Sequence, residues 1–459
     1  MLRGMKFFLF VNLISIKILM CCTIGILKDE DEKPIIFKNR DKAWTYNDGE
    51  IYPHRPNRIY KELGNKNYIA VSSGDFSNPY MGLNEDGFGI VNSIVDENNE
   101  NNLRDDVYKT VDLFKEALNT CSTIDDFASL LGTLDISNTD DGGIIDIKSI
   151  FAVSDLDDAA IFEIFISNDG IDLINVFEEF NLEPENNSIV RTNHFLGTLS
   201  EYNPLLDTDA GTFLRYDKAY EMIDNIQVPL DLFRYNLNNP DLLELPLLRN
   251  LSKSDGNDYQ IPYQKAINKD RAYGYLQSNK SINRSKTVSS VIISNEIMWT
   301  NIGNPIISPY FPIKVSDSIP FLLEGEVDYS QFSILVNEIK EEMFDYSSIY
   351  DYNNYLDSYL LLGENHNGIV NIVDNIESDL VIEYLDPAFN LEDHVTNAYD
   401  ILSIYKNDLL NSFQEQVCEI GEQIFDGQLM YIDATKHYPK SNAWVITDGN
   451  GLVLLDTIS

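Results

Sequence analysis

The stretch from Cys22 to Asp41 constrains the fold most, because two short apolar runs flank a charged break at residues 28–33. The runs are rich in β-branched residues, and the pattern is typical of a β-hairpin with a polar tip. In such a hairpin the thiol of Cys22 lies beside Lys38, Arg40 and Asp41. A thiol next to cations has a lowered pKa and serves as a nucleophile, so we expect Cys22 to be reactive.

The charge balance of the chain excludes some partners. Lys and Arg number 33 against 74 Asp and Glu, which gives a formal net charge of -41 over 459 residues. A field of this sign repels phosphate backbones and anionic lipid headgroups, so we predict no nucleic-acid partner. The hydrophobic content of 44% suffices for the core of a globular protein.

Cysteine and histidine spacing predicts neither a disulfide framework nor a metal centre. Cys21 and Cys22 are adjacent, and the remaining candidates for a bridge are Cys121 and Cys418, whose pairing the sequence leaves open. The five histidines include no HxxxH pair, and the cysteines lack zinc-site spacing. We therefore expect no metal and no cofactor.

Residues 1–21 precede the proposed nucleophile and read as a segment that maturation removes. A basic start and an apolar centre are typical of a secretory signal, and the segment is too short and interrupted for a stable membrane span. The positions before Cys22 lack the small residues of a signal cleavage site, so a propeptide is the alternative. A signal places the protein outside the cell or on its surface, whereas a propeptide or a misassigned start places it in the cytoplasm. The oligomeric state stays open.

The order of predicted elements favours a layered α+β fold. Groups of strands alternate with groups of helices, rather than strand and helix in strict turn. Beyond Pro312 the composition shifts to amphipathic helices at 329–344 and 390–425, and a hairpin signal follows Trp444. We expect a domain at 22–312 and a mainly helical C-terminal extension at 313–459, packed on the core.

Several motifs, taken in order, resemble those of a known family. The chain is similar to the Ntn-hydrolase superfamily, and within it to the linear-amide branch of choloylglycine hydrolases, penicillin V acylases and acyl-coenzyme A:6-aminopenicillanic-acid acyltransferase-like proteins. The resemblance covers residues 22 to about 312. The motifs are Cys22-Thr23, residues 38–41 (KNRD), 82–92 (GLNEDGFGIVN), 191–194 (RTNH), 213–216 (FLRY), 287–290 (TVSS) and 299–305 (WTNIGNP).

The resemblance implies a four-layer αββα sandwich and a role for each matching residue. Once the preceding residues are removed, Cys22 attacks with its thiol, and its own α-amine relays the proton. Asp41 orients that amine, and Asn193 and Asn92 act near the oxyanion. Arg215 belongs to the charge network of the site.

Two positions depart from the family pattern. The family has arginine where this chain has Lys38, which keeps the charge without the planar fork of arginine, so Arg40 is a second candidate for that role. The spacing from the turn at 84–87 to Asn92 is shorter than in choloylglycine hydrolases. Cys21 is a rival nucleophile, but Cys22 is followed by Thr as the family motif requires.

The sequence thus predicts an N-terminal cysteine nucleophile amidohydrolase that cleaves small-molecule acyl amides through a thioester. Enzymatic alternatives are an acyltransferase to an amine acceptor and an Ntn dipeptidase. An alternative of another class is a lipid-anchored acidic surface protein that binds a ligand without chemistry. The substrate itself is not readable from the sequence.

Overall fold

The computed structural model describes residues 22–41, 45–47, 50–52, 57–73, 78–95, 107–134, 144–168, 173–183, 187–203, 211–234, 245–253, 275–277, 281–325, 330–345, 355–357, 361, 368–423, 443–447 and 452–456. The predicted leader at 1–21 lies outside them.

The predicted hairpin forms at the N-terminal end of the described chain. Strands β1 (Thr23–Lys28) and β2 (Pro34–Asp41) pair antiparallel, with Thr23 opposite Asn39 and Lys28 opposite Pro34. They are central in a six-stranded antiparallel sheet, called here the first sheet, whose order is β13-β1-β2-β16-β17-β18. Its other strands are β13 (Ser188–Arg191), β16 (Thr287–Ser294), β17 (Ile297–Asn301) and β18 (Phe311–Ile313).

A second sheet of eight strands faces the first. Its order is β12-β11-β10-β8-β7-β6-β5, and β9 pairs parallel with β10. Its strands are β5 (Asn57–Glu62), β6 (Tyr68–Ser73), β7 (Pro79–Asn84), β8 (Gly89–Ile94), β9 (Val107–Lys109), β10 (Ile144–Ser154), β11 (Ala159–Asn168) and β12 (Leu173–Asn181). Smaller pairings join β3 (Thr45–Asn47) to β4 (Glu50–Tyr52), and β14 (Ser252–Lys253) to β15 (Tyr275–Gln277), β20 (Tyr355–Asp357) and β19 (Phe344–Asp345).

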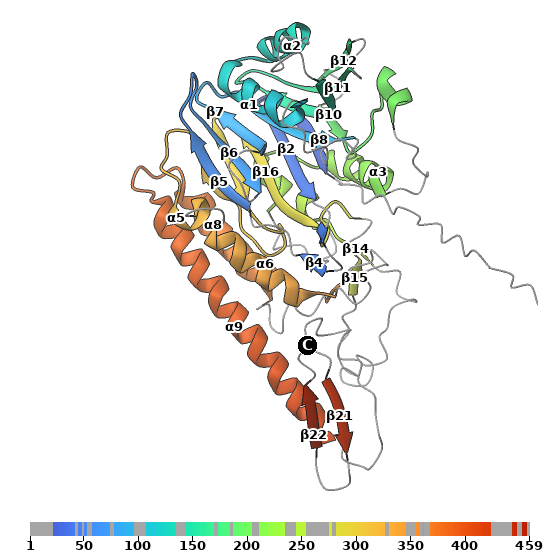
Figure 1. Cartoon of the computed structure of the whole chain (residues 1–459). Helices are drawn as coiled ribbons and strands as arrows, with labels where there is room; N and C mark the ends of the chain where they lie inside the picture. The colour runs from blue at the N-terminus through green and yellow to red at the C-terminus, as the bar shows by residue number, and fades with distance from the viewer. Residues whose placement is uncertain are drawn as a thin grey trace, which may run out of the picture.

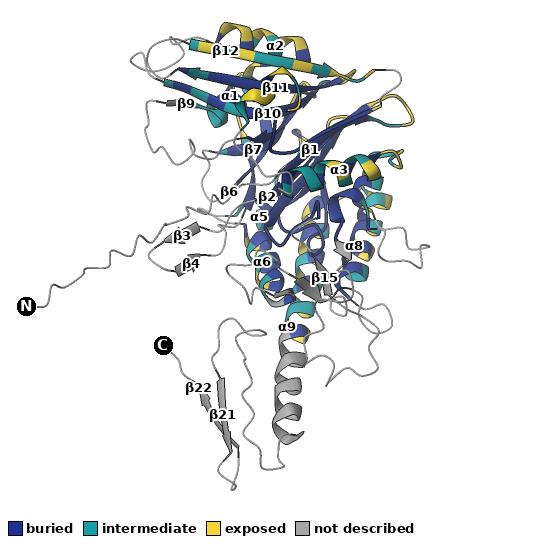
Figure 2. Ribbon diagram, turned by 90° about the vertical axis from the view of Figure 1, so that its right-hand side faces the viewer, coloured by how far each residue is buried: buried dark blue, intermediate teal, exposed yellow. Residues whose placement is uncertain are grey.

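Helices cover the outer faces of the two sheets, so the apolar core has three clusters. The cluster between the sheets includes Ile36 of β2 and Ile150 of β10. A second cluster joins the outer face of the second sheet to α1 (Thr110–Thr120) and α2 (Ile124–Thr133). A third joins the outer face of the first sheet to α3 (Gly211–Ile223). Figure 2 shows the central strands buried, whereas α2 and β12 expose one side.

The C-terminal helices share the core with the strands. Apolar side chains of α5 (Phe321–Glu324), α6 (Gln331–Met343), α8 (Ile369–Glu383) and α9 (Leu391–Gln423) belong to the cluster between the sheets. Figure 1 shows these helices gathered at the end of the sheets opposite α1 and α2. The chain closes with a hairpin of β21 (Ala443–Thr447) and β22 (Leu452–Asp456), as predicted.

Several elements lie where the sequence patterns predicted neither strand nor helix, among them β5 and α8. Strand β5 lies within a segment rich in turn residues, and α8 is rich in β-branched residues, which have low helix propensity. Among the described residues, no helix has both the length and the apolar character needed to cross a membrane.

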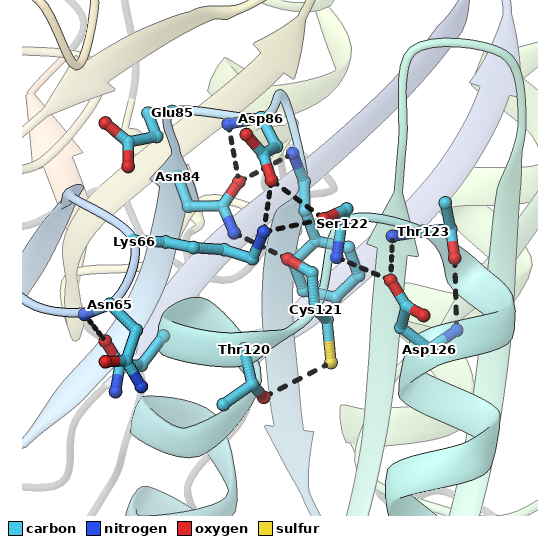
Figure 3. A network of polar contacts seen from close by, with 12 residues as sticks. Asn65, Lys66, Asn84, Glu85, Asp86, Thr120, Cys121, Ser122, Thr123 and Asp126 are labelled. Atoms are coloured by element: carbon cyan, nitrogen blue, oxygen red, sulfur yellow. Dashed lines mark hydrogen bonds and ion pairs between the residues drawn. The ribbon is translucent and has the colours of Figure 1, made fainter.

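The turn between β7 and β8 is held by the side chain of Asn84 (Figure 3). Its carboxamide oxygen accepts from the backbone N–H groups of Asp86 and Phe88, each at 3.1 Å, and its Nδ2 donates to carbonyls at the end of α1. Lys66 Nζ donates to Asp86 and, at 2.7 Å, to the Ser122 hydroxyl. The turn is therefore a structural anchor that aligns β8, the strand that carries Asn92.

Candidate active site

Cys22 lies immediately before β1, where the ends of three strands of the first sheet meet. The antiparallel partners of β1 are β2, which ends at Asp41, and β13, which ends two residues before Asn193. The Cys22 side chain is buried, and the backbone N–H of Asp41 donates to its sulfur. The hairpin thus brings the thiol and the Asp41 backbone together as the sequence predicted.

The pKa of the Cys22 thiol is raised, whereas the sequence predicted that it would be lowered. Burial favours the neutral thiol, and this effect outweighs the opposing influence of Lys38, the Asp41 backbone N–H and Arg40. The sequence revealed the neighbouring charges but not the exclusion of water. A thiol held neutral in this way needs a base to take its proton before it can attack.

Asp41 is held by Thr287, the first residue of the TVSS motif, and by Arg284, which the sequence analysis did not single out. The Thr287 hydroxyl donates to Asp41 Oδ1 at 2.5 Å, and Arg284 Nη1 lies 3.6 Å from Oδ2. Burial raises the pKa of Asp41, although Arg284 and Arg215 both favour its charged form. Because β16 pairs with β2, Thr287 lies opposite Asp41. The order of the strands in the sheet is therefore the information needed to find Thr287 and the nearby Arg284.

Two of the candidate site residues, Asn193 and Arg215 of α3, are in contact. Arg215 Nη2 donates to Asn193 Oδ1 at 3.2 Å. Asn193 Nδ2 donates to the Ser93 hydroxyl at 3.0 Å and to the Ile94 carbonyl at 2.7 Å. The Asn193 amide is therefore fully engaged, and it must release one of these bonds to donate to an oxyanion.

The segment that carries Asn193 is clamped by Glu163 of β11. Glu163 Oε1 accepts from Arg191 Nε at 2.7 Å, and its carboxylate also accepts from the backbone N–H groups of Leu196 and Gly197. Both Glu163 and Arg191 are buried. This clamp fixes the chain on both sides of Asn193.

Lys38 of the first sheet forms hydrogen bonds to residues of the second sheet. Its Nζ donates to Asn92 Oδ1 at 2.9 Å and to the Tyr80 carbonyl at 3.0 Å. The guanidinium of Arg40 lies over the Tyr80 ring, 3.9 Å from its centre, and Nη1 donates to Asn57 at 2.9 Å. Asn92 thus contacts the predicted charge network through Lys38.

Helix α6 brings a further cation that the sequence analysis missed. Lys340 is buried, and the carboxylates of Glu341 and, more weakly, of Asp41 favour its charged form. The sequence does carry a signal for this buried cation. Lys340 falls on the apolar stripe of the helix that Val336, Ile339 and Met343 form.

In the part of the chain that the structure describes, no group of three His, Cys, Asp or Glu side chains is placed to hold a metal ion. Cys121 is a buried free thiol. The described residues of the candidate site offer a buried thiol, a carboxylate, amides and cations.

Comparison with known proteins returns solved structures of amide-cleaving enzymes. The chain is similar to penicillin V acylase from Agrobacterium tumefaciens, with 14% identity, 64% of this chain and 86% of that chain covered, and a TM-score of 0.35. A variant of conjugated bile acid hydrolase from Clostridium perfringens matches with 13% identity, 67% and 97% coverage, and a TM-score of 0.35. The Caenorhabditis elegans ortholog of N-acylethanolamine-hydrolyzing acid amidase matches with 12% identity, 44% and 78% coverage, and a TM-score of 0.27.

No family model matches the chain, and no curated protein matches it. Penicillin V acylase and bile acid hydrolase, which these matches include, are also the kinds of protein that the motifs resemble. At such low identities and TM-scores, we infer the function from the residues of the site.

Proposed function

We propose that the protein is an amidohydrolase whose nucleophile is Cys22 once the preceding residues are removed. The observation that carries the proposal is the buried thiol at the start of β1, bonded to the Asp41 backbone and lying at the same end of the strands as Asn193. Amide hydrolysis needs a nucleophile, a base and donors to the oxyanion, and these residues are of the required types.

The raised pKa of Cys22 supports a mechanism in which the free α-amine acts as the base. The reference pKa of an α-amine, about 8, suits proton transfer near neutral pH. The amine takes the thiol proton as sulfur attacks the amide carbon, and the amide C–N bond then breaks. The proton passes to the leaving amine, and water hydrolyses the thioester to a carboxylic acid and regenerates the thiol.

The layering supports the same proposal. Apolar clusters between α1, α2 and the second sheet, between the two sheets, and between the first sheet and α3 fit a four-layer αββα sandwich. We include in the proposal that residues 313–459 are an extension of this sandwich, and that removal of residues 1–21 accompanies export or maturation.

The test begins with the N-terminus of the mature protein and a panel of acyl amides assayed for release of the amine. We expect a free Cys22 amine and thiol-dependent turnover that falls about 100-fold or more in Cys22→Ser and is lost in Cys22→Ala. Cys121→Ala is the matched control, because this thiol is also buried and free but lies in the cluster under α1 and α2, and it should keep full turnover.

Each alternative predicts a different result. Full turnover in folded Cys22→Ala excludes the mechanism, and an acylated or uncleaved Cys22 amine favours a lipid-anchored binding protein. Transfer of the acyl group to added hydroxylamine in preference to water favours an acyltransferase. Cleavage confined to dipeptides favours a dipeptidase.

A further inference from the structure

His194 is a buried histidine that the proposed mechanism does not use. It directly follows Asn193 in the chain, its side chain is 1% exposed, and its ring packs against Phe213 of α3. Burial and the guanidinium groups of Arg191 and Arg215 lower its pKa to about 4, so the imidazole is neutral at physiological pH. A neutral imidazole carries one proton, on either Nδ1 or Nε2, and the neighbouring groups decide which.

The hydroxyl groups of Thr192 and Thr212 meet at Nδ1 of His194. Nδ1 lies 3.0 Å from Thr192 Oγ1 and 3.0 Å from Thr212 Oγ1. The Thr192 hydroxyl donates to the Thr212 backbone carbonyl at 3.0 Å, and the Thr212 hydroxyl donates to Thr192 Oγ1 at 2.9 Å. The Thr212 hydroxyl also accepts from the Asn193 backbone N–H at 3.0 Å. All four residues are buried, so the network is satisfied by its own members.

The protons of this network assign the tautomer of His194. A carbonyl cannot donate, so the contact with the Thr212 carbonyl uses the one hydroxyl proton of Thr192. The contact between the two hydroxyl groups then uses the one hydroxyl proton of Thr212. Neither hydroxyl has a proton left for the imidazole, so Nδ1 is the donor in both of its contacts. Nε2 has no hydrogen-bond partner among the described residues, so the bonds of Nδ1 alone decide the tautomer.

The network ties both sides of Asn193 to the N-terminal end of α3. Thr192 and His194 flank Asn193 in the chain, and Thr212 is the second residue of α3. Arg215, about one turn further along the same helix, donates to Asn193 Oδ1 at 3.2 Å. The network therefore holds α3 and the Asn193 segment together. This arrangement bears on the proposed reaction, in which Asn193 Nδ2 exchanges a protein acceptor for the oxyanion while the residue itself stays in place.

We propose that His194 is a positioning residue for Asn193, held as the Nδ1–H tautomer, and that it acts by donating to the Thr192 and Thr212 hydroxyl groups. This inference rests on the proposed function, because it explains how Asn193 is placed for that reaction. His194 transfers no proton in the reaction. Its Nδ1 proton is bonded to the two hydroxyl groups, and the α-amine of Cys22 is the proposed base.

The tautomer is tested on wild type without an assay of turnover. Long-range proton–nitrogen correlation spectra of protein labelled with nitrogen-15 in histidine distinguish a protonated ring nitrogen from a bare one. We expect the His194 signal, identified by its absence from His194→Asn, to show Nδ1–H and a bare Nε2 from about pH 6 to about pH 9. His394 is an internal reference, because its Nε2 lies 3.2 Å from a Glu383 carboxylate oxygen and carries a proton. Nε2–H in His194 overturns the inference.

The positioning role is tested with three substitutions of His194. Asparagine carries an amide N–H close to the place of Nδ1, glutamine carries its amide near the place of Nε2, and leucine has no donor. We expect kcat to fall about tenfold or more in His194→Leu and His194→Gln, with KM changed less than about twofold. His194→Asn should recover most of kcat. A role in packing alone predicts the reverse order, because leucine fills the apolar side of the site better than asparagine does.

Two further variants complete the kinetic test. Thr212→Val removes the hydroxyl between His194 and the Asn193 N–H, so it should lower kcat by a similar factor, and Thr212→Val combined with His194→Leu should lose little more. His394→Leu is the matched control, because it removes a histidine of α9 that takes no part in this network, and it should leave kcat unchanged.

The inference and the proposed function fail on different results. Full kcat in folded His194→Leu, or a lower kcat in His194→Asn than in His194→Leu, overturns the role of His194 while wild-type turnover still supports the proposed function. A wild type that cleaves no amide overturns the proposed function and, with it, the positioning role, whatever the spectrum shows.

Discussion

A buried ammonium without a hydrogen bond destabilises the folded state, and Lys340 is in that position even though the carboxylates of Glu341 and Asp41 favour its charge. The folded protein holds its pKa near 8, whereas the unfolded chain has the ordinary value of 10.5. Between these values the unfolded chain binds more protons, so the folded state gains stability as pH rises through this window. Below pH 8 the full penalty of burying the charge is present.

This difference predicts a pH-dependent effect of Lys340→Met. We expect the variant to be more stable than wild type at pH 7, with an advantage that shrinks by about 3 kcal/mol as pH rises from 8 to 10.5. Urea denaturation of both proteins across this pH range measures the difference in their unfolding free energies. The contributions of all other titrating groups cancel in this difference. A constant difference, or a variant less stable at pH 7, contradicts the prediction.

At the residue scale, the sequence located one part of the candidate site and missed another. Cys22, Lys38 and Asp41 are close in sequence, so one hairpin brings them together. Arg284 lies near Asp41, and Lys340 is under its electrostatic influence, only because segments far apart in sequence pack together, which a local pattern does not specify. Burial likewise reversed the expected direction of the Cys22 pKa shift.

At the scale of elements, the apolar runs on either side of the charged break at 28–33 were enough to predict the hairpin of β1 and β2. Helix α2 carries a start signal in its sequence, the Thr123 cap, whose hydroxyl accepts from the Asp126 N–H. Helix α8 was missed because its buried positions are largely Ile and Val, and packing overrides their preference for strands. Strand β5 was missed because turn residues surround it.

The clamp on the Asn193 segment gives a prediction at this scale. Glu163→Gln removes the counter-charge of buried Arg191 and should cost about 3 kcal/mol of unfolding free energy. Turnover should fall as well, because the segment that carries Asn193 loses its anchor on β11. Chemical denaturation and kcat measure the two effects.

Glu178→Gln is the matched control for this clamp. Glu178 accepts from Thr198 of the same segment, but at an exposed position, so its loss should cost less than about 1 kcal/mol. Equal effects of the two variants would mean that the buried pair does not hold the segment.

At the scale of the whole molecule, a buried ion pair joins the C-terminal helices to the rest of the chain. Glu377 of α8 accepts from Arg249 through both oxygens, and its Oε1 also accepts from the Tyr310 backbone N–H at 2.9 Å. Arg249 Nη1 also donates to the Phe233 carbonyl. The helices beyond residue 312 and the sheets are thus parts of one packed structure.

This connection predicts cooperative unfolding. Urea titration followed by far-UV circular dichroism and by reaction of the Cys22 and Cys121 thiols should give one coincident transition. Glu377→Leu should shift both probes together by about 3–5 kcal/mol, because it leaves Arg249 buried and unpaired. Adding Arg249→Met should restore part of that loss. Separate transitions for helices and thiols would indicate two independent domains.

The burial of Cys22 between β2 and β13 also restricts when the chain can be cut. An external protease needs several residues in an extended, accessible conformation, and the residue after the scissile bond here is enclosed by neighbouring strands. Under the proposed removal of residues 1–21, the cut before Cys22 would be made either while the nascent chain is still unfolded or from within, by the thiol itself. The enzyme would then be activated once, when the chain is synthesised and folds, and later contact with proteases would not activate it.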